Sequence, residues 1–257
     1  MFLAVDIGNT NIVMSFHDGK QWGRTWRIHT DTKKTSDEYL VIMETLWENS
    51  GFDRTAVRHA AISSVVPNLT RAIQKDIQRI FSISPLMLSM QVKTGLDMST
   101  VPSEIGQDIM CNLAAAHQMF PDRVAMTLDC GTAMTFSTVD EKGRVLGVAI
   151  LPGLVTAVNA LFGNTAQLPQ VELKIPTSVL GRNTVDSIRA GIMLGYIEMI
   201  DGMIERTEKE LGKKIAVIAT GGLSSTIASE IPRIDVLAPN HTLDGLRLIS
   251  EMNRETT

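Results

Sequence analysis

The chain is poor in cysteine, in long apolar runs and in clustered positive charge, and each shortage removes a class of protein. Its 257 residues include two cysteines, Cys111 and Cys130. Two thiols so far apart form no disulfide framework and lack the spacing of metal ligands. No apolar run reaches the ~18 residues of a membrane-spanning helix. The net charge is −4 with no Lys/Arg-rich run, so neither nucleic acid nor a membrane is an expected partner.

Familiar nucleotide motifs and targeting signals are missing as well. The chain contains no G-x-x-x-x-G-K-[ST] string and no G-x-G-x-x-G string, which disfavours P-loop and dinucleotide-binding folds. Its first predicted strand starts at Phe2, which leaves no room for a signal peptide. We therefore expect a cytoplasmic protein of one large or two smaller domains.

What the chain does contain is one short pattern that occurs twice. An apolar strand ends in Asp-x-Gly-(Asn or Thr) and a second apolar run follows, at residues 6–11 and again at 129–133. The turn glycine can adopt positive φ, so that successive backbone N–H groups face one anion, and the strand-end Asp can hold Mg²⁺. A single copy is more often an ordinary hairpin turn. Two copies favour an ATP phosphate site, with these candidate residues: Asp6, Gly8, Asn9, Thr10, Asn11, Asp129, Gly131 and Thr132.

The order of predicted elements repeats in the two halves. Three hairpin-connected strands are followed by alternating helices and strands, first from residue 2 to 89 and again from 124 to 252. Capping signals support two of the helices, at Thr35 with Glu38 and at Asn183 with Asp186. This plan predicts an α/β protein of two actin-like (ribonuclease H-like) halves, each a mixed sheet with helices, with the nucleotide cleft between them. We place the halves at 1–118 and 119–257, with the break near 115–123.

Two further places could carry chemistry. Asp108 follows Gly106 and Gln107 and would lie in the first turn of a helix, where the dipole favours its ionised form. It could accept the proton of a substrate hydroxyl, although an Asp that only compensates the dipole is the more common case. Gly221 and Gly222 follow a buried-type strand and would let a flat base approach the backbone, or would simply form a turn. Gly191 and Gly195 could form a smooth helix stripe for a subunit contact or, more commonly, for a core.

As a set, these strings resemble the type III pantothenate kinase family over the whole chain. The matching strings stand in the family's order, at residues 6–11, 62–67, 129–135, 151–154, 165–169, 181–184 and 220–223. The resemblance implies transfer of the γ-phosphate of ATP to the primary hydroxyl of pantothenate, giving 4'-phosphopantothenate in the first step of coenzyme A synthesis. It also implies a homodimer with the pantothenate pocket near the subunit interface.

The resemblance also implies roles for single residues. Asp6 would handle Mg²⁺, and Gly8 to Asn11 the phosphates. Asp129 would bind a monovalent cation (K⁺ or NH₄⁺) and Thr132 would contact ATP. Asp108 matches the family's general base. Substrate contacts would include Gly106, Gln107, the position of Ile109, and Thr184.

Two departures from the family pattern fall in the implied substrate pocket. The family has Gly-x-Asp-Arg, whereas Ile109 stands here in place of the Arg, and Ser99 stands near the place of a usual Tyr. Losing a cationic partner of a substrate anion costs about 1.5–3 kcal/mol. A third departure is Gly147-Val148 in place of a Gly-Gly pair. Two alternatives therefore stay open: a kinase of another small hydroxylated substrate, and a non-catalytic nucleotide-binding paralogue with a regulatory role.

Overall fold

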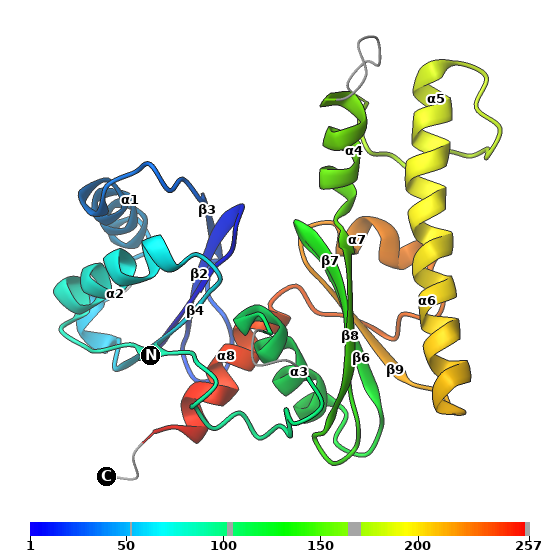
Figure 1. Cartoon of the computed structure of the whole chain (residues 1–257). Helices are drawn as coiled ribbons and strands as arrows, with labels where there is room; N and C mark the ends of the chain where they lie inside the picture. The colour runs from blue at the N-terminus through cyan, green and yellow to red at the C-terminus, as the bar shows by residue number, and fades with distance from the viewer. Residues whose placement is uncertain (52, 102–104, 164–170, 255–257) are drawn as a thin grey trace. The chain divides into compact units, whose positions relative to one another are not determined.

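Two five-stranded sheets with the same internal order form the framework of the computed structural model (Figure 1). The structure describes all residues except 52, 102–104, 164–170 and 255–257. The first sheet has the order β3-β2-β1-β4-β5 and the second the order β10-β9-β6-β7-β8. The strands are β1 (Phe2–Ile7), β2 (Asn11–His17), β3 (Trp26–His29), β4 (His59–Ser64), β5 (Leu86–Met87), β6 (Ala125–Cys130), β7 (Ala133–Val139), β8 (Val145–Pro152), β9 (Ala216–Thr220) and β10 (Val236–Leu237).

The repeated plan of two mixed sheets that the sequence predicts is confirmed. In each sheet an antiparallel hairpin (β1–β2 or β6–β7) lies beside a parallel strand (β4 or β9). Each central strand carries its Asp at the fifth of six positions, where Asp6 pairs with Val13 and Asp129 pairs with Thr135. The two Asp-x-Gly loops are therefore equivalent places in two copies of one plan, which is the actin-like fold.

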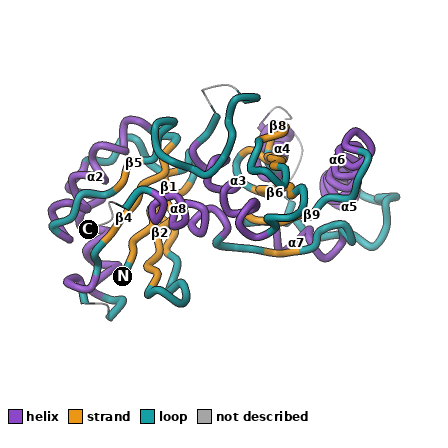
Figure 2. Tube along the Cα trace, turned by 90° about the horizontal axis from the view of Figure 1, so that it is seen from below, coloured by secondary structure: helices purple, strands orange, loops and turns teal. Residues whose placement is uncertain are grey.

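The first sheet is covered by helices on both faces. Its helices are α1 (Ser36–Glu48), α2 (Pro67–Phe81), α3 (Gln107–Met119) and α8 (His241–Met252), with a short 3₁₀ turn at Arg54–Ala56. Leu3 and Val5 of β1 join the core beneath α1 and α2, whereas Phe2 and Ala4 join the core formed with α3 and α8. Figure 2 shows α8 beside β1 and β4. Side chains alternate along a strand, so Asp6 shares the face of Phe2 and Ala4.

The second sheet packs its helices on the face that presents Met126 and Leu128. These helices are α4 (Leu154–Gly163), α5 (Thr184–Arg189), α6 (Gly195–Leu211) and α7 (Ser224–Ile227), with a 3₁₀ turn at Ala228–Glu230. The long helix expected from 183 to 211 is present as α5 and α6, joined by a π-helical segment at Ala190–Leu194 (Figure 1). Within the described residues, no helix is both long and apolar enough to cross a membrane.

The two compact units do not follow the linear division expected from the sequence. The first unit contains residues up to Met119 together with Gly143–Val145 and the segment from Asn240, and the second contains Phe120–Lys142 and Leu146–Pro239. The chain passes from the first unit to the second after Met119, and α8 belongs with the first unit. The reason is its apolar face, since Leu243, Leu246 and Ile249 are buried against α3 and β1.

Candidate functional site

The first Asp-x-Gly loop is held in shape by backbone hydrogen bonds and by one distant threonine. The N–H of Gly8 donates to the carbonyl of Asn11 at 3.0 Å and closes the turn. Thr30, which is buried, donates its hydroxyl to Gly8 O at 2.7 Å and its N–H to Thr10 O at 2.9 Å. The side chains of Asn9, Thr10 and Asn11 stay exposed, so the loop presents polar donors to solvent.

Asp108 lies in the first turn of α3, where two hydrogen bonds fix the backbone. Its Oδ1 accepts from the N–H of Ile109 at 2.9 Å, and Oε1 of the preceding Gln107 accepts from Ser64 N at 2.8 Å. Ser64 ends β4 and is the register partner of Ile7 at the end of β1. The start of α3 is therefore tied to the strand ends from which the Asp6 loop leaves.

The charges of Asp6 and Asp108 both act on one buried thiol, that of Cys111. Burial raises the pKa of Cys111 well above its ordinary value, and the negative charges of Asp6 and Asp108 raise it further. Asp6 and Asp108 therefore both lie within electrostatic reach of the Cys111 side chain. Burial also raises the pKa of Asp108 itself, against the lowering effect of the hydrogen bond from Ile109. A carboxylate whose pKa is raised by burial holds a proton more strongly, as a general base requires.

Gly106 has a steric role beside Asp108. A Cβ built on it would lie 2.4 Å from Oδ1 of Asp108, so only glycine permits the carboxylate to fold back over the start of the helix. Ile109 is 5% exposed, and Ser99 is exposed and donates its N–H to Asp97 at 3.0 Å. The isoleucine that stands where the family has Arg is thus a packed side chain in this structure.

The second Asp-x-Gly loop is held by the segment that follows β8. The N–H of Gly153 donates to the carbonyl of Thr132 at 2.9 Å, and the hydroxyl of Thr156 donates to the same oxygen at 2.7 Å. A Cβ on Gly153 would lie 2.1 Å from Gly131 O, so the approach requires glycine. Gly131 and Thr132 are exposed, as Asn9 and Thr10 of the first loop are.

Gly221 and Asp129 meet at the end of the second sheet. Thr220 is the register partner of Asp129, and the chain turns at Gly221 with a φ of +90°. A Cβ on Gly221 would lie 2.6 Å from Oδ1 of Asp129 and 2.7 Å from the backbone of Cys130. Gly222 has open space at the same position. The turn at Gly221 therefore does more than connect two elements, because it places the backbone against Asp129, a candidate cation ligand.

Alanine at these two glycines is expected to give different results. Gly221→Ala combines positive φ with overpacking and should destabilise the chain by about 1–3 kcal/mol while displacing Asp129. Gly222→Ala has no such conflict and serves as the matched control. Melting temperature and ATP affinity measured on both variants check the prediction. Equal, near wild-type values for the two would contradict this account of the turn.

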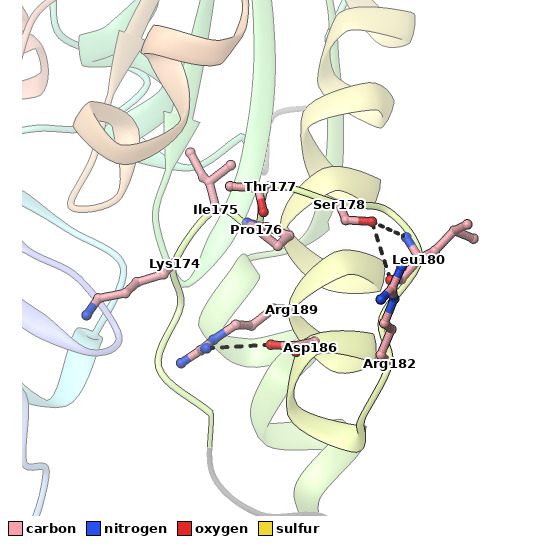
Figure 3. Close-up of a pocket in the computed structure, with 9 residues that line it drawn as sticks. All are labelled: Lys174, Ile175, Pro176, Thr177, Ser178, Leu180, Arg182, Asp186 and Arg189. Atoms are coloured by element: carbon pink, nitrogen blue, oxygen red, sulfur yellow. Dashed lines mark hydrogen bonds and ion pairs between the residues drawn. The ribbon is translucent and has the colours of Figure 1, made fainter.

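Thr184 begins α5 beside a pocket rich in positive charge. Asn183 caps the helix as expected, since its side chain accepts from the N–H of Asp186 at 2.9 Å. A cavity of about 430 Å³ lies next to it and is lined by three cations, Lys174, Arg182 and Arg189. Figure 3 shows Arg189 directed to Asp186, at 4.0 Å, with Arg182 on the opposite side of the pocket.

The two strand-end carboxylates would bind cations with help from other oxygens. The described residues hold no group of three His, Cys, Asp or Glu side chains able to bind a metal ion. Mg²⁺ commonly takes one carboxylate with water and substrate phosphate, so Asp6 fits that pattern. Burial raises the pKa of Cys130 to about 12, helped by the charge of Asp129, which favours the neutral thiol.

One of the sequence interpretations changes in the structure. For Gly191 and Gly195 a core position is the more common of the two alternatives, but both are exposed and nothing lies within 4 Å of a Cβ built on either. Thr30, Thr156 and the amide of Gln107 support the site, and of these three the sequence indicates only Gln107, as a substrate contact. No local sequence signal identifies Thr30, because its partners lie about twenty residues away. The matching string at 165–169 lies outside the described residues.

Comparisons with known proteins agree with this geometry. A family model described as type III pantothenate kinase matches residues 2–206. The chain belongs to this family. A type III pantothenate kinase of Myxococcus xanthus is 41% identical over 254 residues, covering 98% of this chain and 99% of that protein. One from Moorella thermoacetica is also 41% identical, covering 98% and 100%. Membership in a kinase family implies use of ATP.

Solved structures support the actin-like fold. A protein from Campylobacter jejuni, titled a conserved putative Baf family transcriptional activator, aligns with a TM-score of 0.60 at 19% identity, covering 98% of both chains. The (R)-2-hydroxyglutaryl-CoA dehydratase component A of Acidaminococcus fermentans aligns with a TM-score of 0.52 at 14% identity, covering 98% of this chain and 96% of that one. At these identities the likeness concerns the fold alone.

Proposed function

We propose that the chain transfers the γ-phosphate of ATP to the primary hydroxyl of pantothenate, giving 4'-phosphopantothenate for coenzyme A synthesis in the cytoplasm. Family membership supports the reaction, and one observation carries the residue assignment. The start of α3, which carries Asp108, is tied through Gln107 and Ser64 to the ends of β4 and β1, where the Asp6 loop begins. A base beside a phosphate-binding loop is the arrangement that phosphoryl transfer to an alcohol needs.

In this proposal each side chain has a simple task. Asp108 accepts the hydroxyl proton, while Gly106 and Gln107 set its orientation and lie against the substrate with Ile109. The loops at Gly8–Asn11 and at Gly131–Thr132 donate to phosphate oxygens. The backbone at Gly221 and Gly222 lies against the adenine ring of ATP. Asp6 would hold Mg²⁺ and Asp129 K⁺ or NH₄⁺, and these cations would neutralise charge on the transferred group.

A coupled ADP-release assay tests the reaction. With Mg²⁺ and K⁺ present, ADP release should depend saturably on pantothenate and should fall when Mg²⁺ is chelated or K⁺ is replaced by Na⁺. A panel of similar alcohols serves as the control for substrate identity. A higher kcat/KM for another alcohol would overturn the choice of substrate. A rate of ADP release that does not depend on the concentration of any alcohol would overturn the kinase assignment.

The pocket beside Thr184 offers the positive charge that Ile109 does not. We propose that Thr184 contacts pantothenate and that Arg182 attracts its carboxylate. Arg182 is exposed and, among the described residues, has no carboxylate within 4 Å, whereas Lys174 pairs with Glu172 and Arg189 with Asp186. Cations of this kind contribute through charge-assisted hydrogen bonds.

Arg182→Gln should therefore raise KM for pantothenate about tenfold or more. The matched substrate is pantothenol, which has the same primary hydroxyl but no carboxylate, and its KM should change little. An equal change for the two substrates would show that Arg182 does not act on the carboxylate.

We also propose that the chain forms a homodimer. Val179 and Leu180 are 70% and 77% exposed, and the nearby helix presents the smooth positions Gly191 and Gly195. A face that combines exposed apolar side chains with a small-residue stripe is suited to close packing against a second copy. Light scattering at micromolar concentration should give twice the chain mass of 28.1 kDa, and a monomeric mass would contradict the proposal.

A further inference from the structure

A second charged cavity lies in the first unit, at the starts of β1 and β4. It has a volume of about 260 Å³ and is lined by three arginines and two histidines: Arg58, Arg247, Arg254, His17 and His59. The amino group of Met1 also borders it and donates to Ala56 O at 2.7 Å. Asp6 lies at the other end of β1, about 13 Å along the strand from Phe2 at ~3.3 Å per residue. The cavity is thus separate from the site described above.

The positive charges in this cavity are only partly neutralised. Its two carboxylates are Asp18 and Glu251. Asp18 accepts from the N–H groups of Lys20 at 2.7 Å and Gln21 at 2.8 Å, and Glu251 pairs with Arg247 at 2.7 Å. Neither Arg58 nor Arg254 has a carboxylate within 4 Å among the described residues. An excess of positive charge therefore gathers in one hollow of a chain whose net charge is −4.

One guanidinium group lacks an acceptor for part of its hydrogen-bonding capacity. Nε of Arg247 is buried and has no hydrogen-bond partner among the described residues, although Nη1 binds Glu251. A buried donor without an acceptor is unfavourable, and an anion oxygen would supply one. Arginine pairs well with phosphate-type groups because its planar fork donates two parallel hydrogen bonds.

The pKa values of the two histidines are lowered by burial and by the positive charges around the cavity. Burial lowers the pKa of His17, and Arg247 lowers it further, against the raising effects of Asp18, Asp244 and Glu251. Burial likewise lowers the pKa of His59, with Arg254 and the amino group of Met1 acting in the same direction. Nδ1 of His17 accepts from the N–H of Gly19 at 3.1 Å, which leaves Nε2 to donate. A bound anion would reverse the effect of the cations and favour protonation of both rings.

We propose that this cavity binds a small phosphate-type dianion, free or as the terminal phosphate of a small metabolite. Arg58 and Arg254 supply charge, Arg247 supplies a directed donor, and His17 and His59 make the affinity rise as the pH falls. The volume is several times the ~30 Å³ share of one water in the liquid, which is enough for a phosphoryl group with part of its hydration.

The test uses the full chain with histidine ring resonances followed by NMR at constant ionic strength. Sulfate is the first probe because it stays a dianion between pH 6 and 8, and inorganic phosphate at pH 8 is the second. We expect saturable shifts of His17 and His59 alone among the five histidines, higher pKa values for both when the site is filled, and tighter sulfate binding at pH 6 than at pH 8.

Variants separate a built site from general attraction of anions. Arg58→Gln and Arg254→Gln should each weaken sulfate binding about tenfold or more. Arg206→Gln removes an exposed arginine from α6 and should leave the affinity for sulfate unchanged. It is the control for the change in net charge. Unshifted resonances of the other three histidines show that the variants remain folded. Shifts that do not saturate, that chloride reproduces, or that survive the Arg58→Gln/Arg254→Gln double change would overturn the proposal.

Discussion

Replacing Asp108 with asparagine is expected to lower kcat by about 10²–10⁴, the usual range for loss of a general base. The amide keeps the shape of the side chain and can still accept from the N–H of Ile109, but it cannot take the hydroxyl proton. ATP affinity should be unchanged, because the proposed phosphate contacts lie on the loops that begin at Asp6 and Asp129. Turnover and ATP affinity measured on both proteins check the combination.

The pKa of Asp108 adds a prediction about stability. Burial raises its folded-state pKa above that of an unfolded Asp, so the unfolded chain releases this proton at a lower pH than the folded chain does. Stability is then lost as the pH rises from the unfolded pKa through the folded one, and the full cost is present at neutral pH. Asp108→Asn should therefore keep or raise the melting temperature at pH 7. A purely structural Asp108 would give the opposite result: a lower melting temperature with near-normal turnover.

Asp76 provides a matched control for this experiment. It is buried, its pKa is likewise raised by loss of solvent, and its carboxylate accepts from the hydroxyl of Ser36 at 2.9 Å. It lies in α2, away from the Asp6 loop by its position on the other face of the first sheet. Asp76→Asn should affect the melting temperature in the same direction and leave kcat unchanged. A comparable loss of turnover in both variants would end the assignment of Asp108 as the base.

The pH dependence of wild-type turnover should reveal the titration of Asp108. Turnover is expected to fall as the pH falls through the raised pKa of Asp108, since the base becomes protonated. In Asp108→Asn the remaining turnover should lose this acidic limb. The comparison separates loss of turnover through protonation of Asp108 from loss through unfolding at low pH. The melting temperatures of the two proteins measure the second effect.

Local patterns were enough to predict the repeated plan. The two Asp-x-Gly hairpins are encoded within about ten residues each, and Thr35 and Asn183 form the helix caps that their neighbours indicated. Caps and tight turns depend on a few adjacent side chains, so they can be read from a short window. The equivalent positions of Asp6 and Asp129 follow from the same short sequence pattern, an apolar strand that ends in Asp-x-Gly.

Tertiary contacts account for what the sequence could not predict. The place of α8 depends on its packing against α3 and β1, and the support of the first loop by Thr30 depends on how β3 ends beside it. The exposure of Gly191 and Gly195 depends on what the second unit leaves uncovered. None of these has a signature at short range, because each needs segments that are far apart in the chain.

Gly245→Ala is expected to be the most destabilising of the conservative changes considered. A Cβ at this position in α8 would lie 1.9 Å from the carbonyl oxygen of Cys111 and 2.4 Å from its carbonyl carbon, so α3 and α8 would have to separate. The two helices are also joined by hydrogen bonds from His241 and Thr242 to Asn112, at 3.0 and 2.8 Å. Overpacking against backbone should cost about 1–3 kcal/mol or more, against a helix-propensity gain of about 0.5–1 kcal/mol.

Gly202→Ala is the matched control, because it makes the same change within α6 where nothing lies within 4 Å of the new Cβ. It should stabilise the chain by about 0.5–1 kcal/mol, so that urea unfolding gives opposite signs for the two variants. Since α3 carries Asp108 in its first turn, Gly245→Ala should also lower kcat of the folded protein, and Gly202→Ala should not. If both variants shift the unfolding free energy alike and keep full turnover, the α3–α8 contact deforms freely. In that case the position of Asp108 is set by the link of Gln107 to Ser64 alone.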